Sequence, residues 1–277
     1  MNRLSSFVIV LALAAIGTGL YLYLRPEPVP PTANVEPPPP VVAEPTEPIA
    51  PPAPAPEIQH PIEPPAAAAE EPQRAAPPDI NVALSGLLSR DSVLAFFNLD
   101  RFIQRAVATV DNLARPHAPP TVWPVNPTPG RLALDGAAPD EHIAAANYDR
   151  YKPFVAAIAA VDAGRAAALY RQLYPQFQQA YEELGYPRGY FNDRLVAVID
   201  ILLATPDPAE PIAVDLPEVK GPKELQRPWA RYQYSDPSLE ALPAGQKILL
   251  RMGPENRRAL KAKLAELRRH IAQPMPQ

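Results

Sequence analysis

The chain has 277 residues, a net charge of −4, no cysteine and 41 prolines. So small a net charge gives no indication of nucleic-acid binding, and the lack of cysteine excludes disulfides, thiolate metal sites and a cysteine nucleophile. Twenty of the prolines lie between Pro26 and Pro78, a stretch that cannot build a packed core. About 200 residues remain, enough for one domain with a sizeable interior.

An apolar, uncharged run occupies residues 7–24. A helix rises about 1.5 Å per residue, so the run spans roughly 27 Å, enough for a thin hydrocarbon core. Tyr21 and Tyr23 suit the headgroup layer, and a slight charge bias favours a cytoplasmic N-terminus. We therefore expect residues 1–25 to be a single-pass anchor in a bacterial inner membrane, with the rest exported to the periplasm. The alternative is a cleaved signal peptide, although its apolar core is normally shorter.

Residues 26–78 consist mainly of Pro, Ala, Glu and Val, with eight Glu and one Arg. Proline fixes φ and removes a backbone donor, so helix and sheet do not propagate and the segment samples polyproline II. The composition predicts a disordered acidic linker that acts as a spacer. The alternative is that one of its PxxP spacings docks a proline-binding partner.

Residues 79–277 are expected to form the exported domain. Apolar residues with helical spacing begin near Ile80 and predict a mainly α, bundle-like fold with a small β element. Residues 80–115 fit two helices with a break near 89–91, where Ser and Asp are suited to N-caps.

A proline-rich stretch follows at 116–139 and predicts a long irregular loop, which is either functional or a mobile excursion. Residues 140–160 are expected to be helical, with a kink or a break at Pro153.

The next helix is expected to start after Asp162 as its N-cap and to run to Leu184. Gly185 is suited to a left-handed C-cap, and Pro175 is expected to bend or split this helix. Another helix fits residues 191–204.

Residues 212–220 and 229–234 alternate in polarity and predict a short antiparallel pair. Helices are then expected over 237–252 and from Pro254 to the C-terminus. The last helix has one apolar stripe without an aromatic anchor, so we expect it to pack onto the domain and not onto a membrane. Five of its basic residues are expected to be mostly exposed: Arg257, Arg258, Lys261, Arg268 and Arg269.

Two runs resemble a known family: LYPQFQQAYEELGYPRGYFNDRLVAVIDILLATP (169–206) and YQYSDPSLEALPAGQKILLRMGPENRRALKAKL (232–264). They are similar to a proteobacterial family known only as a domain of unknown function. Its members also have a membrane helix, a proline-rich stretch and then a folded domain. The resemblance covers roughly residues 80–270 and implies no activity, ligand or catalytic residue.

No motif predicts catalysis or cofactor binding. The sequence has no His pair with helical spacing, no glycine-rich phosphate loop and no G-x-S-x-G. We therefore assign no catalytic residue, no metal site and no cofactor. Glu182 and Glu183 leave open a peptidoglycan hydrolase in which a partly buried Glu acts as acid, but we expect both side chains to be solvated and not catalytic.

Two aspartates near these residues are interpreted as structural. Asp193 is expected to be a helix cap or the partner of Arg188 or Arg194. Asp200 lies among apolar residues, so its charge is expected to need an ion-pair partner.

Half of the chain's aromatic residues fall between residues 148 and 191. Tyrosine suits protein and carbohydrate partners because its ring packs while its hydroxyl hydrogen-bonds. The alternative is a core whose hydroxyls lie at its rim. Six residues form the candidate binding surface: Tyr170, Tyr174, Phe177, Tyr181, Tyr186 and Tyr190.

Together these features favour a non-enzymatic envelope protein that presents an interaction domain to another envelope protein or to the cell wall. The alternative is a periplasmic peptidoglycan hydrolase that uses a carboxylate.

Overall fold

The computed structural model describes residues 57–62, 79–217 and 230–272. Of the two units into which the chain divides, 1–53 and 54–277, every described residue belongs to the second. The expected membrane segment lies outside the described residues, as does most of the expected linker.

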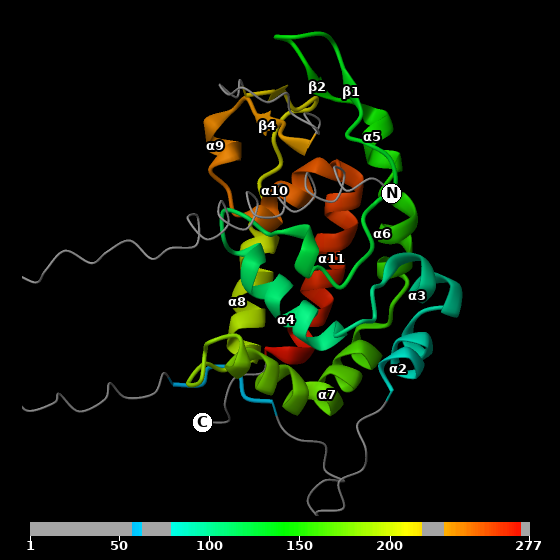
Figure 1. Ribbon diagram of the computed structural model, residues 1–277, viewed down its shortest axis with the longest axis vertical. Helices are drawn as coiled ribbons and strands as arrows, with labels where there is room; N and C mark the ends of the chain where they lie inside the picture. The colour runs from blue at the N-terminus through cyan, green and yellow to red at the C-terminus, as the bar shows by residue number, and fades with distance from the viewer. Residues whose placement is uncertain (1–56, 63–78, 218–229, 273–277) are drawn as a thin grey trace, which may run out of the picture. The chain divides into compact units, whose positions relative to one another are not determined.

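The second unit is mainly helical, as the sequence predicted (Figure 1). Its elements in chain order are α2 (Ile80–Leu87), α3 (Arg90–Phe96), α4 (Phe102–Leu113), the 3-10 helix η2 (Pro120–Val122), β1 (Leu134–Asp135), β2 (His142–Ile143), α5 (Ala145–Asp149), α6 (Lys152–Ala159), α7 (Ala163–Glu183), α8 (Phe191–Leu203), β3 (Val214–Asp215), β4 (Gln233–Tyr234), α9 (Pro237–Glu240), α10 (Ala244–Arg251) and α11 (Pro254–Ile271).

The core lies between helices that cross one another. Helices α8 and α11 run side by side, and α7 packs across one end of both (Figure 1). Helix α4 packs against α7 and α8, while α6 packs against α11. Apolar residues three and four apart on each helix fill these contacts. The most deeply buried of them include Val107, Phe191, Val196, Ile199, Leu250 and Ile271.

Two short antiparallel strand pairs lie near the other end of α8 and α11 (Figure 1). Val214 pairs with Tyr234, which confirms the expected pairing of these two segments, although each strand is only two residues long. The sequence missed the second pair, in which Leu134 faces Ile143, because two residues carry no readable alternation.

Three helices occupy the range where the sequence predicted two. The first break is as expected, since the Ser89 side chain accepts the Ser92 N–H at the start of α3. The second break was not predicted and precedes α4 at Arg101, whose φ of 46° is left-handed. No glycine marks this position, so composition gave no indication of it.

The proline-rich stretch 116–139 is held against the rest of the unit. The Asn98 N–H donates to the Pro124 carbonyl at 2.9 Å, and the Asn126 N–H donates to the Phe96 carbonyl at 2.8 Å. These bonds satisfy backbone groups at the end of α3 that the helix itself leaves unpaired.

Proline acts differently at the two positions where a break was considered. Residues 140–160 do split, into β2, α5 and α6, and Pro153 lies in the first turn of α6, where a missing N–H costs nothing. Helix α7 continues through Pro175 because residues on both sides of the proline are buried. That burial offsets the roughly 3 kcal/mol that an interior proline costs. The expected Asp162 cap and the left-handed Gly185 are both present.

Helix α11 packs onto the domain through the expected stripe, with Leu260 and Ile271 buried. Of the five basic residues expected to be mostly exposed, Arg258 and Arg269 are exposed, while Lys261 and Arg268 are half-buried. The expectation is wrong for Arg257, which is 1% exposed. Its Nε donates to Asp207 at 2.9 Å, and this bond lowers the pKa of Asp207. A long arginine side chain can cross an apolar surface and place its charged end beside an acid at the edge of that surface. Residue spacing alone does not reveal such a contact.

The carboxylate of Asp200 has the ion-pair partner that the sequence required. Arg268 of α11 donates to both of its oxygens, at 2.5 and 2.9 Å. This two-point contact joins α8 to α11.

In the described part of the chain no single helix is long and apolar enough to cross a membrane. The bent pair α6 and α7, which meet at 82°, meets that test only when the two helices are counted together.

Ile271 fills the junction of α7, α8 and α11 and is 1% exposed. We expect Ile271→Ala to lower the free energy of unfolding by about 2–5 kcal/mol, because it removes buried methyl groups and leaves a cavity. Chemical denaturation of the purified chain measures this. Ala262→Ser, at an exposed position of the same helix, is the control and should change little. Equal effects of the two changes would contradict the packing described.

Candidate site for an extended peptide

The six aromatic residues singled out from the sequence come together in one apolar cluster, which also contains residues of α4 and the start of α8. Tyr174 and Tyr181 are buried, and the other four are partly buried. The aromatic cluster is therefore largely core, with hydroxyls at its rim. A role in binding stays a prediction for these six residues.

Ring contacts hold the turn between α7 and α8. Tyr181 stacks on Tyr186 with ring centroids 4.6 Å apart, and the rings of Tyr174 and Tyr190 lie 5.4 Å apart. Such pairs stabilise a structure beyond the area they bury. The turn therefore fixes the side chains that follow it at the start of α8.

A short segment, Glu57–Ile62, lies along this turn as the short blue trace in Figure 1. The Ile62 side chain packs against the aromatic cluster. The segment falls inside the range expected to be a disordered linker, so its contact with the domain was not predicted. Disorder elsewhere in that range stays a prediction, because those residues lie outside the described part.

Asp193, in the first turn of α8, binds two successive amides of the segment. Its Oδ2 accepts the Gln59 N–H at 3.0 Å, and its Oδ1 accepts the His60 N–H at 2.7 Å. Hydrogen bonds to an ionised acceptor are roughly twice as strong as neutral ones. This carboxylate is the main polar contact of the segment.

Two further bonds complete the contact. The Tyr190 hydroxyl accepts the Ile62 N–H at 2.7 Å, and Asn192 Nδ2 donates to the His60 carbonyl at 2.8 Å. All four bonds go to main-chain groups of the segment, so they constrain its backbone and not its side chains.

Asn192 is held on all sides and is fully buried. Its Nδ2 also donates to the Ile271 carbonyl at 2.9 Å, while its Oδ1 accepts the Tyr170 hydroxyl at 3.2 Å. The Tyr174 hydroxyl accepts the Asn192 N–H at 3.4 Å, which serves one of the free amides of the first turn of α8. The domain by itself therefore holds the side-chain amide of Asn192 in the position where it binds the segment.

The sequence indicated a helix cap or an arginine partner for Asp193, and it did not predict that both of its oxygens accept linker amides. The only hint in the sequence that this part of the linker contacts the domain is Ile58 and Ile62, two bulky apolar residues in a stretch of small and acidic ones.

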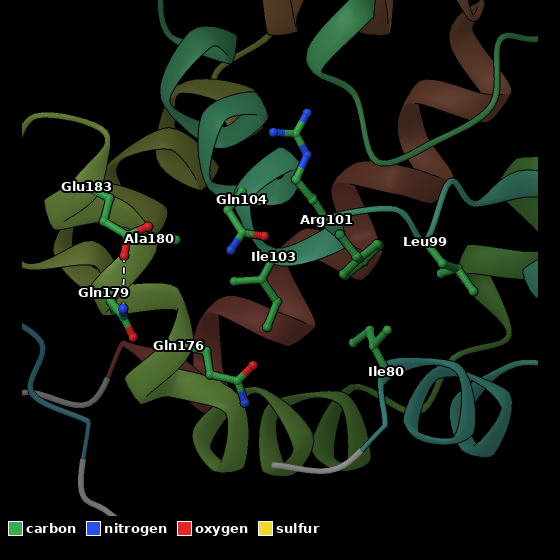
Figure 2. Close-up of a pocket in the computed structure, with 10 residues that line it drawn as sticks. Ile80, Leu99, Arg101, Ile103, Gln104, Gln176, Gln179, Ala180 and Glu183 are labelled. Atoms are coloured by element: carbon green, nitrogen blue, oxygen red, sulfur yellow. Dashed lines mark hydrogen bonds between the residues drawn. The ribbon is translucent and has the colours of Figure 1, made fainter. Parts of the chain in front are cut away.

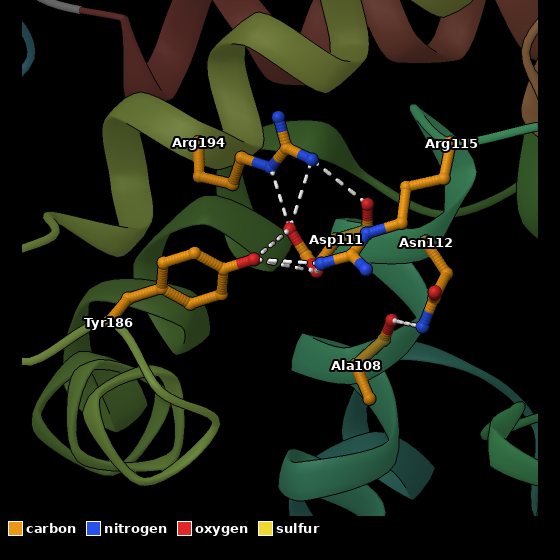
Figure 3. Close-up of polar contacts among 6 residues, drawn as sticks. All are labelled: Ala108, Asp111, Asn112, Arg115, Tyr186 and Arg194. Atoms are coloured by element: carbon orange, nitrogen blue, oxygen red, sulfur yellow. Dashed lines mark hydrogen bonds and ion pairs between the residues drawn. The ribbon is translucent and has the colours of Figure 1, made fainter.

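Arg194 instead reaches the buried carboxylate of Asp111 on α4 (Figure 3). Its Nε donates to Asp111 Oδ1 at 3.1 Å, and its Nη2 donates to the Asp111 carbonyl at 2.9 Å. Arg115 donates to Oδ2 at 2.5 Å, and the Tyr186 hydroxyl donates to the same oxygen at 3.2 Å. One carboxylate thus joins α4, α8 and the turn after α7, with every oxygen satisfied.

The two glutamates considered for catalysis lie on the last turn of α7 and are exposed. Glu182 accepts the side-chain amide of Gln178 at 2.8 Å, and Glu183 accepts that of Gln179 at 2.9 Å. A general acid of the kind considered is normally desolvated, and neither residue is.

A pocket of about 400 Å³ opens between the start of α4 and the end of α7 (Figure 2). Its polar lining consists of one cation, one carboxylate and three amides, from Arg101, Glu183, Gln104, Gln176 and Gln179. Glu183 is the only carboxylate among the lining residues described. Glycoside hydrolysis normally uses a pair of them, so the pocket does not supply that chemistry.

Among the described residues no group of three or more His, Asp or Glu side chains is placed to hold a metal ion.

The fold and the site define a helical domain that holds a short segment of its own chain through hydrogen bonds to the main chain of that segment. The chain belongs to the family described as "Protein of unknown function (DUF3014)", whose model matches residues 102–268. No curated protein and no solved structure matches the chain. The match begins at α4, so it includes the residues that receive the segment but not the segment itself.

Asp111→Asn is expected to lower the free energy of unfolding by about 3 kcal/mol, because it leaves two arginines without their buried counter-charge. Denaturant titration of the purified chain measures the change. Asp149→Asn is the matched control, since its ion pair with Lys152 is exposed and should contribute little. A variant as stable as the parent chain would show that the buried pair is dispensable.

Burial raises the pKa of Tyr148, Tyr170, Tyr174 and Tyr234 above its ordinary value. The buried, protonated tyrosines contribute fully to the free energy of unfolding below the unfolded-state pKa of about 10. That contribution is lost as the pH rises through the higher folded-state pKa values. We expect the denaturation midpoint to fall between about pH 9 and about pH 11, with tyrosinate absorbance rising as the chain unfolds. A midpoint that is constant over this range would contradict the burial of these hydroxyls.

Proposed function

We propose that this protein is a non-enzymatic component of the bacterial cell envelope, held in the inner membrane by residues 7–24. Its helical domain acts in the periplasm by binding another envelope protein or a cell-wall component. The uncharged apolar run and the acidic, proline-rich linker support the anchor and the spacer. The membership of a family without known activity neither adds to this role nor opposes it.

One observation supports a binding role above all: the start of α8 already holds a short segment of its own chain. Asp193, Asn192 and Tyr190 hold residues 59–62 through the backbone, and the aromatic cluster receives Ile62. In peptide recognition, main-chain hydrogen bonds provide affinity and contacts with side chains provide specificity, and this site supplies both.

The alternative, a peptidoglycan hydrolase, needs an acid set in a cleft away from water. The exposed positions of Glu182 and Glu183 lend it no support. Asp111, the buried carboxylate of the domain, is fully used by its ion pairs.

The membrane topology follows directly from the proposal. A phosphatase that is active only after export, fused behind residue 277, should be active in cells. The mass of the detergent-extracted chain should include the N-terminal segment, because an uncleaved helix is the anchor. The control is the same phosphatase fused behind a chain that lacks residues 1–25, and this fusion should be inactive.

A mature chain that starts near residues 16–20 would contradict the anchor, and an inactive fusion would contradict the export. Release of muropeptides from cell wall by the purified chain, lost in Glu182→Gln or Glu183→Gln, would replace the binding role with the enzymatic one.

A further inference from the structure

The segment 59–62 is recognised in a way that does not depend on most of its side chains. Its four hydrogen bonds use the amides of residues 59, 60 and 62 and the carbonyl of residue 60. The side chain of Ile62 is the one that packs against the aromatic cluster. Another peptide with the same backbone groups and an apolar residue in that place meets the same contacts.

Proline fits the one position where the site needs no donor. Pro61 has no N–H, and neither Asp193 nor Tyr190 takes a bond from it. Proline also restricts the conformations open to the residue before it, here His60. A proline here therefore lowers the entropy lost on binding without losing a bond.

We propose that Tyr190, Asn192 and Asp193 form a recognition site for short peptide segments in which two residues with free amides precede proline and an aliphatic residue. Residues 59–62 occupy the site within the same chain, and a segment of an envelope partner with this chemistry displaces them. The proposal rests on the binding role proposed above and names the chemistry of the partner.

The chain's own segment competes strongly with any such partner. Sixteen residues, 63–78, join it to Asp79 at the start of α2, so its effective concentration at the site is on the order of millimolar. A segment that is docked about 90% of the time lowers the apparent affinity for an external peptide about tenfold. Weakening the resident segment should therefore expose the site.

The chain itself offers a natural comparison peptide. The pattern Xaa-Pro-Ile-Xaa-Pro-Pro occurs at 47–52 and again at 60–65, with Glu47 in the place of His60. The Nδ1 atom of His60 is buried and has no hydrogen-bond partner in the described structure, so no donor is present there for a carboxylate. Glu at this position would be desolvated close to the Asp193 carboxylate, and both effects oppose binding.

The test uses the full chain in detergent and a fluorescein-labelled peptide of residues 55–64, with binding followed by anisotropy. Ile62→Asp in the chain removes the apolar anchor of the resident segment and leaves the site intact. We expect this variant to bind the peptide at least about tenfold more tightly than the parent chain. Adding Asp193→Asn, which keeps the shape but removes the charge and leaves one acceptor oxygen for two amides, should weaken binding at least about tenfold.

A peptide of residues 42–51 is expected to bind the Ile62→Asp chain at least about tenfold more weakly than the first, and Glu47→His in that peptide should restore binding. Thermal melts of each chain variant, close to that of the parent, show that the domain remains folded.

Three results would overturn the proposal. Equal binding to the parent and Ile62→Asp chains would place the peptide elsewhere, and no saturable binding to a folded Ile62→Asp chain would make the contact a structural brace only. Unchanged binding after Asp193→Asn would show that the carboxylate does not recognise the peptide. None of these results bears on the fusion and mass measurements, so the envelope role stands or fails separately.

Discussion

The corner where α7, α8, the end of α11 and the docked segment meet depends on one buried amide. Asn192 contacts all four of these parts through its side chain and its own N–H. A buried amide must satisfy both of its polar ends. Tyr170 and Ile271 do this within the domain, and the His60 carbonyl is a second acceptor for Nδ2. This constraint makes the docked segment part of the same network that positions the start of α8. Recognition and folding therefore share their contacts at this corner.

The aromatic cluster and the Asp111 network give that corner its rigidity. Stacked rings hold the turn after α7, while the Asp111 carboxylate joins α4 to α8 through Arg194. Arg194 and Asp193 are adjacent in α8 and serve opposite purposes, since one binds inside the domain and the other binds the linker. A site whose groups are fixed in advance loses little entropy on binding, and this favours peptides that are themselves stiffened by proline.

The charge of α11 is used largely within the domain. Arg257 reaches Asp207, Arg268 holds Asp200, and the Lys261 ammonium donates to the Thr205 carbonyl at 2.8 Å. The positive charge of α11 is thus partly neutralised by α8 and the chain that follows it. The docked segment at the start of α8 remains the better-supported surface for a partner.

Periodicity and capping residues determined much of the fold from the sequence alone. The 3.6-residue spacing predicted α7, α8 and α11, Asp162 and Gly185 marked the ends of α7, and the strand pair Val214 with Tyr234 followed from alternation. These features are local, so neighbours in sequence are enough to specify them. The six aromatic residues were also found as a group, but not the segment that covers one edge of them.

Only the tertiary structure decided which groups meet across long stretches of chain. Gln59 lies 134 residues from Asp193, and Arg257 lies 50 residues from Asp207, so no spacing links either pair. Helix α7 likewise continues through Pro175 because the residues around the proline are buried, and local helix propensity does not predict that burial. A proline-rich stretch is predicted to be disordered because it cannot build a core of its own. Residues 57–62 are ordered for a different reason, because the domain supplies the partners that their backbone lacks.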